Sequence, residues 1–113
     1  MSEAQLIAEA FPEFAAELEG LLRVEGEGAL AKQVASLRIV ERCQCGDDFC
    51  ATMYTIPKPK GAWGPSHRNV LPEAESGMII VDVVDEKIAE IEVLYRDEIR
   101  KKLNDIIPLV KCG

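Results

Sequence analysis

The chain has 113 residues, of which 48% are hydrophobic and 29% are charged, and its net charge is −7. A chain of this length is expected to form a single domain over residues 1–113, with enough core to fold without disulfides or metal. No apolar run approaches the roughly 18 residues that a membrane span needs, and the polar start is unlike a signal peptide, so a cytoplasmic protein is expected. The acidity argues against nucleic acid as a partner, because that binding depends on neutralising phosphate charge.

The first quarter of the chain has the periodicity of helices. Apolar residues recur at helical spacing over residues 7–22, but Pro12 cannot lie inside a helix without the loss of a hydrogen bond. We therefore expect a short helix that ends near Ala10, and a second helix with Pro12 in its first turn. Gly26 follows the last apolar position and is expected to terminate the second helix.

Two hairpins are expected to form the sheet. Residues 34–45 alternate in the manner of a strand, residues 46–48 (Gly-Asp-Asp) are typical of a turn, and residues 49–56 are rich in β-forming side chains. Further on, the nearly continuous apolar run 78–84 and the alternating run 88–95 flank a tight turn. Both pairs are therefore predicted to be antiparallel.

The remaining segments are a long loop and a closing helix. Residues 57–72 contain repeated prolines and glycines and are predicted to have no regular structure. Residues 96–107 carry a helical apolar stripe that Pro108 ends. The predicted fold is α+β, with a four-stranded antiparallel sheet of two hairpins that is covered on one face by the N-terminal helices and the C-terminal helix.

Three of the four cysteines lie in the first predicted turn, in the pattern Cys43-x-Cys45-Gly46-x-x-x-Cys50. Without a secretory signal, such cysteines are expected to be reduced thiols or metal ligands before they are expected to be disulfides. Strand alternation puts Cys43 and Cys45 on the same face as Ile39, so we expect the cluster to point into the core.

Zinc is the metal that these residues would suit. Thiolates and imidazole in a tetrahedral array are its preferred ligands, and the candidate set is Cys43, Cys45, Cys50 and His67, with Cys112 as an alternative fourth ligand. The other interpretations are inert buried thiols, a disulfide or redox pair, and a nucleophilic cysteine with His67 as its base.

The loop 57–72 is a candidate binding surface. It combines cations and the only tryptophan of the chain without any acid: Lys58, Lys60, Trp63, His67 and Arg68. Such a group suits an anionic ligand or the hot spot of a protein interface. The alternative is that Trp63 folds down over the core while the cations are solvated.

Asp82 interrupts the apolar run 78–84. Because a buried carboxylate needs either a partner or a raised pKa, we expect Asp82 to face outward or to form a structural ion pair rather than to act as a general base. The candidate partners are arginines: Arg38, Arg42 and Arg68.

Several of these segments together resemble a group of small bacterial proteins with no established function. The likeness covers roughly residues 37–103 and implies only that the cysteine turn and the His67 loop belong to one unit. The segments that carry it are Cys43-x-Cys45-Gly46-x-x-x-Cys50, Tyr54-Thr55-x-Pro57, Gly64-Pro65-x-His67-Arg68-Asn69-Val70 and Gly77-Met78-Ile79-Ile80-Val81-Asp82.

The glycine-rich, metalloprotease and serine-hydrolase motifs of common enzymes are absent from the sequence, which favours a non-enzymatic protein. The expected function is that of a small intracellular binding protein that neutralises or regulates a partner through its sheet and the loop 57–72. The expected partner is a basic protein, a second copy in a homodimer, or a small anionic ligand, and neither nucleic acid nor membrane. The alternatives are a zinc-binding module and a thiol-dependent enzyme or redox sensor.

Overall fold

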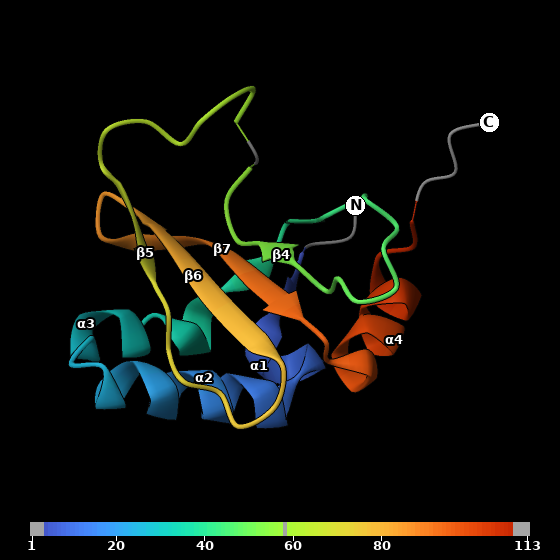
Figure 1. Ribbon diagram of the computed structural model, residues 1–113, viewed down its shortest axis with the longest axis horizontal. Coiled ribbons are helices and arrows are strands. Elements are labelled where there is room, and N and C mark those ends of the chain that lie inside the picture. Colours follow the sequence, from blue (N-terminus) through green and yellow to red (C-terminus); the bar gives the residue numbers. More distant parts are fainter. Residues whose placement is uncertain (1–3, 58, 110–113) are drawn as a thin grey trace.

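The computed structural model describes residues 4–57 and 59–109. The protein is α+β: a five-stranded antiparallel sheet lies across a layer of helices, and a small two-stranded sheet lies beside it (Figure 1). In chain order the elements are β1 (Gln5–Leu6), α1 (Ile7–Ala10), α2 (Pro12–Val24), α3 (Gly28–Ala31), the 3-10 helix η1 (Val34–Ser36), β2 (Arg38–Ile39), β3 (Glu41–Arg42), β4 (Met53–Tyr54), β5 (His67–Val70), β6 (Met78–Val84), β7 (Lys87–Leu94) and α4 (Asp97–Ile106).

The helical layer is divided where the sequence predicts. Helix α1 ends at Ala10 and α2 begins at Pro12, whose missing N–H costs nothing in a first turn. Leu18 and Leu22 of α2 are fully buried against the sheet. The helix ends two residues before Gly26, which has the positive φ of 79° that glycine adopts without strain. This part of the prediction is confirmed.

The central hairpin is also confirmed. Strands β6 and β7 pair antiparallel and are joined by a turn in which Asp85 and Glu86 both have positive φ. That turn matches the right-handed twist of the two strands. The inward side chains of these strands, such as Val81 and Ile91, are fully buried and form the middle of the core.

The prediction of four strands is wrong in its details. The main sheet has the order β3-β4-β7-β6-β5, so the two hairpins are joined through β4 and β7, and β5 adds a fifth strand. Strand β5 lies inside the segment predicted to have no regular structure. Between Pro65 and Pro72 every residue keeps its N–H, which leaves room for the four residues that pair with β6.

The predicted strand 34–45 is divided between two sheets. It begins as the 3-10 helix η1, pairs as β2 with β1, and then pairs as β3 with β4. The alternation is interrupted at Val40, where the chain passes from one sheet to the other, so Ile39 and Arg42 are both buried. Cys45 is consequently exposed and Cys43 is only half-buried, so the expectation that these two cysteines point into the core is wrong, whereas Cys50 is buried.

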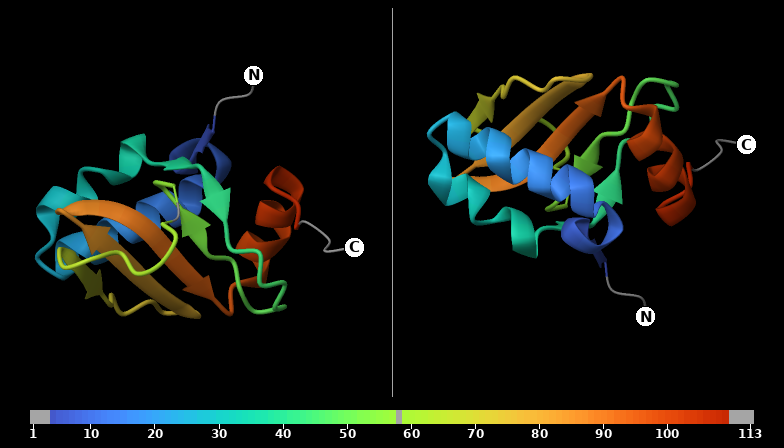
Figure 2. Two further views of the ribbon diagram at one scale, coloured as in Figure 1. Left: turned by 90° about the horizontal axis from the view of Figure 1, so that it is seen from above. Right: turned by 90° about the horizontal axis from the view of Figure 1, so that it is seen from below.

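Helix α4 closes the fold beside α1 and the first turns of α2 (Figure 2). Its buried residues Ile99 and Leu103 extend the core. The opposite face of the sheet carries no helix in the described chain and is crossed instead by the loop between β4 and β5 (Figures 1 and 2). Among the described residues, none of the helices is both long and apolar enough to cross a membrane.

Candidate metal centre on the outer sheet face

We call the sheet surface that faces away from α1, α2 and α3 the outer face. One row of side chains crosses it over four neighbouring strands, because the register pairs Tyr54 with Glu90, Glu90 with Asp82, and Asp82 with Asn69. Directly opposed residues of antiparallel strands point to the same side of a sheet. The row therefore gathers an aromatic hydroxyl, two carboxyls and an amide on one surface.

Two aromatic side chains cover this row. The Nε1–H of Trp63 donates to Oε1 of Glu90 over 3.4 Å, and the indole lies 6.4 Å from the ring of Tyr54 and 6.5 Å from that of His67 (centroid distances). Nε2 of His67 is 2.8 Å from Oδ1 of Asp82. The loop between β4 and β5 thus folds back onto the outer face of its own sheet.

The cysteine turn lies at one end of the same face. The N–H of Cys43 donates to the carbonyl of Thr52, and Gly46 turns the chain with a φ of 79°. Cys50 then pairs with Leu94 of β7, which returns the third cysteine to the sheet. The sulfur atoms of Cys43, Cys45 and Cys50 all lie within 4.8 Å of one another, and all three thiols are free.

Cys45 and Cys50 differ in how readily they ionise. Burial disfavours the thiolate of Cys50, but its hydrogen bonds with Thr52, Cys45 and Cys43 outweigh burial and lower its pKa. The backbone N–H of Asp47 favours the thiolate of Cys45, whereas burial and the neighbouring Cys43 and Cys50 raise its pKa to about 12. Of Cys45 and Cys50, Cys50 is therefore the thiol that loses its proton first.

A buried cation lies beneath the turn. The guanidinium of Arg42 donates to the carbonyl of Cys43 over 3.0 Å, to Oδ1 of Asn104, and to the carbonyl of Ile107 over 3.3 Å. Burial lowers its pKa, while attraction to the three nearby thiols raises it, and an arginine stays charged in proteins. Helix α4 thus holds a positive charge next to the cysteines.

Three carboxyl groups form a second cluster, two residues along the sheet from Cys50. Asp82, Glu90 and Glu92 bring their oxygens within 4.8 Å of one another. Burial, and then the contact with Asp82, raises the pKa of Glu92 to about 8. Two residues along a strand span about 6.6 Å, so the thiols and the carboxyls are close neighbours on one face.

The sequence pattern predicts the thiol cluster but not the carboxyl cluster. The spacing of the cysteines around Gly46 indicates a turn, whereas the meeting of Asp82, Glu90 and Glu92 depends on the register of β6 and β7. That register includes a bulge between Asp82 and Val83, which places Glu90 opposite Asp82. The turn at residues 85–86 would by itself place Ala89 opposite Asp82, so it does not predict this meeting of the acids.

The predicted fourth metal ligand lies elsewhere. His67 contacts Asp82 and is not part of the group formed by the three sulfur atoms. Cys112, the alternative ligand, lies outside the described residues. Asp82 is buried with His67 and Asn69 as its partners instead of an arginine.

The structure also separates the residues of the predicted binding loop from one another. Arg68 points to the helical side, where it forms ion pairs with Glu27 and Glu86 at 3.0 and 2.8 Å. Lys60 is exposed, whereas Lys58 lies outside the described residues. Trp63 and His67 contact the outer face, so the five predicted residues do not form one patch.

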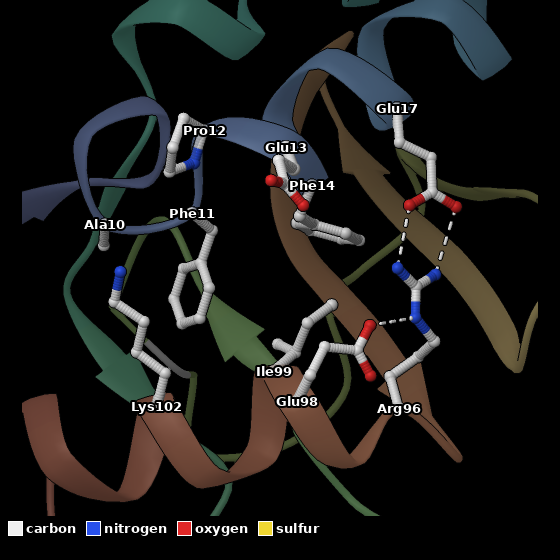
Figure 3. Close-up of a pocket in the computed structure, with 10 residues that line it drawn as sticks. All are labelled: Ala10, Phe11, Pro12, Glu13, Phe14, Glu17, Arg96, Glu98, Ile99 and Lys102. Carbon is white, nitrogen blue, oxygen red and sulfur yellow. Dashed lines mark hydrogen bonds and ion pairs between the residues drawn. The ribbon is translucent and has the colours of Figure 1, made fainter.

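A hollow of about 330 Å³ between α2 and α4 lies away from both clusters (Figure 3). Both of its cations are already engaged: Arg96 pairs with Glu17 and Glu98, each at 2.8 Å, and Lys102 lies over the ring of Phe11. These contacts explain the hollow as a seam between helices. The chemistry of this protein is concentrated on the outer face instead.

The fold and the site define an α+β protein with thiol and carboxyl clusters on the exposed face of its sheet. Comparison of the chain with protein-family models, with curated proteins and with solved structures finds no significant match.

Proposed function

We propose that this protein is a zinc-binding module in which Cys43, Cys45 and Cys50 hold the metal. The main support for the proposal is that the sulfur atoms of these three free cysteines lie within 4.8 Å of one another. Tetrahedral zinc with Zn–S bonds of about 2.3 Å requires sulfur atoms about 3.8 Å apart. Small side-chain rotations close that difference, and the exposed Cys45 leaves the metal a path of entry.

The electrostatics of the turn support this proposal. Three thiolates around Zn²⁺ leave a single negative charge, and the buried guanidinium of Arg42 lies next to them to balance it. Zinc binding releases the thiol protons, so a thiol whose pKa is already lowered, that of Cys50, favours the bound state. Three protein ligands leave the fourth position to water or to a substrate, as in catalytic zinc sites.

The contrast between two thiols favours a second candidate function, a thiol redox centre. Cys50 has a lowered pKa and Cys45 a raised one, which is the division between an attacking and a resolving cysteine. Selective alkylation distinguishes the two candidates. A redox centre predicts rapid labelling of Cys50 that added zinc does not slow, whereas a zinc site predicts protection of all three cysteines by zinc.

The direct experiment is metal analysis of untagged protein that has been purified under reducing conditions without a chelator. We expect about one equivalent of zinc per chain. Replacement of the zinc by Co²⁺ should give the intense visible absorption of a tetrahedral site, together with thiolate-to-cobalt charge transfer in the near ultraviolet. Less than about a tenth of an equivalent, with no cobalt spectrum on titration, would overturn the proposal.

Matched serine variants locate the site. Cys43→Ser and Cys50→Ser should each weaken cobalt binding by at least about tenfold, because a serine hydroxyl does not replace a thiolate ligand. Cys112→Ser, which lies outside the proposed ligand set, should bind as the wild type does. His67→Gln should also retain the metal, since His67 contacts Asp82 and not the thiols.

A further inference from the structure

The carboxyl cluster on the outer face contains an unsatisfied atom. Asp82 is only 3% exposed, and among the described residues its Oδ2 atom has no hydrogen-bond partner while the neighbouring acids are ionised. Its other oxygen, Oδ1, is fully engaged by His67 at 2.8 Å and by Nδ2 of Asn69 at 2.6 Å. These two contacts fix the carboxyl of Asp82 beside the neighbouring acids.

The neighbours of Asp82 in this cluster are also carboxyl groups. Asp82, Glu90 and Glu92 each contribute a carboxyl oxygen, and the three oxygens lie within 4.8 Å of one another. Ionised carboxyls accept hydrogen bonds but cannot donate them. Facing oxygens of this kind are stable only with a proton or a cation between them, because their mutual repulsion is strong in a half-buried site.

The surrounding side chains hold the acids in place. Nε1 of Trp63 donates to Glu90, and His67 and Asn69 donate to Asp82. Donors that orient a carboxylate from behind are the usual second layer of a metal site. They come from β5 and from the loop before it, so the loop that crosses the outer face has a role in orienting these acids.

We propose that Asp82, Glu90 and Glu92 bind a hard divalent cation such as Ca²⁺ or Mn²⁺, at a site distinct from the thiol cluster. Carboxylate oxygens are the ligands that these ions prefer, whereas zinc and other softer metals prefer the thiols. The proposal does not depend on the zinc site, since the two clusters share no ligand. A cation here neutralises the facing acids and satisfies the orphan oxygen of Asp82.

Trp63 makes this site directly observable. It is the only tryptophan of the chain and contacts Glu90, so energy transfer from it to bound Tb³⁺, a luminescent analogue of Ca²⁺, reports a hard cation at this cluster. We expect sensitised emission that saturates on titration and that Ca²⁺ and Mn²⁺ displace. The Cys43→Ser/Cys45→Ser double variant should give the same titration, which separates this proposal from that of a zinc site.

Neutral isosteres test the ligands. Glu92→Gln and Asp82→Asn should each weaken Tb³⁺ binding by at least about tenfold, a loss of about 1.4 kcal/mol. Glu73→Gln, which removes an exposed acid near α2, is the matched control and should bind normally. A thermal-shift measurement confirms that each variant is folded. Ca²⁺ should raise the melting temperature of the wild type and of Glu73→Gln, but not that of Glu92→Gln.

Two results would overturn the proposal. One is the absence of sensitised emission from folded wild-type protein, which would show that a shared proton alone relieves the repulsion between the acids. The other is a Tb³⁺ titration that Glu92→Gln and Asp82→Asn leave unchanged, which would place the ion elsewhere near Trp63. Neither result bears on zinc binding by the thiols.

Discussion

In metal-free protein, Glu92 should make the fold less stable as the pH rises. The folded-state pKa of this residue is about 8, above its ordinary value of 4.5. Between these two values the folded state holds a proton that the unfolded state has released, so the free energy of unfolding falls with increasing pH. The contribution of Glu92 is fully present below pH 4.5 and is lost by pH 8.

The magnitude follows from the same two values. Each pH unit between them lowers the free energy of unfolding by at most about 1.4 kcal/mol, so the total loss cannot exceed about 5 kcal/mol. Glu92 is only half-buried, and water screens part of the repulsion from Asp82. We therefore expect a loss of about 1–2 kcal/mol between pH 5 and pH 8 from this residue.

Glu92→Gln isolates this contribution, because glutamine keeps the shape of the side chain and cannot ionise. Chelator-treated, reduced protein is unfolded with urea at a series of pH values. The free energy of unfolding of the variant should increase relative to that of the wild type as the pH rises. At pH 8 it should be the more stable by about 1–2 kcal/mol. Glu98→Gln is the matched control, since hydrogen bonding to Arg96 lowers the pKa of Glu98 and keeps its titration below this range. A difference between wild type and Glu92→Gln that is constant from pH 5 to pH 8 would refute the reasoning.

Three further perturbations have defined outcomes. Arg42→Met should lower the free energy of unfolding by about 2–3 kcal/mol, since it leaves Asn104 and buried carbonyls without their donor; urea unfolding measures this. Gly77→Ala should be strongly destabilising, because Gly77 has a φ of 68° and a Cβ atom would collide with the carbonyl of Leu94. By contrast, Gly20 lies in α2 with open space around it, so Gly20→Ala should raise the melting temperature and increase the free energy of unfolding by about 1 kcal/mol. Thr52→Val removes the hydroxyl that stabilises the Cys50 thiolate, so the pH midpoint for alkylation of Cys50, followed by mass spectrometry, should rise.

Each of these has an outcome that contradicts it. Arg42→Met at wild-type stability would show that Arg42 is not needed to dock α4. Equal effects of the two glycine substitutions would mean that neither backbone conformation nor space distinguishes the sites. An unchanged alkylation midpoint in Thr52→Val would remove the hydroxyl as the cause of the lowered Cys50 pKa.

The sequence was sufficient to predict the elements whose signals are local. The division of the first helices at Pro12, the hairpin of β6 and β7, and α4 all follow from periodicity and proline geometry. The turn around Gly46 in which the three cysteines lie was also predictable, because its signal lies within eight residues. In each case one short segment contains both the pattern and its physical reason.

Pairings between distant segments could not be predicted in this way. Strand β5 has only four residues among prolines, and it forms because β6 offers a free edge. The change of sheet at Val40 depends on β1, which is 34 residues away along the chain, and it interrupts the alternation from which the orientation of Cys43 and Cys45 was predicted. The contact of His67 with Asp82 follows from that same β5–β6 pairing.

The topology of the sheet also orders events during folding. Strands β5, β6 and β7 are consecutive in the chain and can pair through short loops, whereas Cys50 pairs with Leu94, which is 44 positions further along the chain. Closing longer loops costs more entropy, so the three-strand meander should form early and the cysteine segment should join it later. The nascent chain would then expose its thiols until this last docking step. The carboxyl cluster, whose three acids all lie in β6 and β7, would be assembled before the thiol cluster.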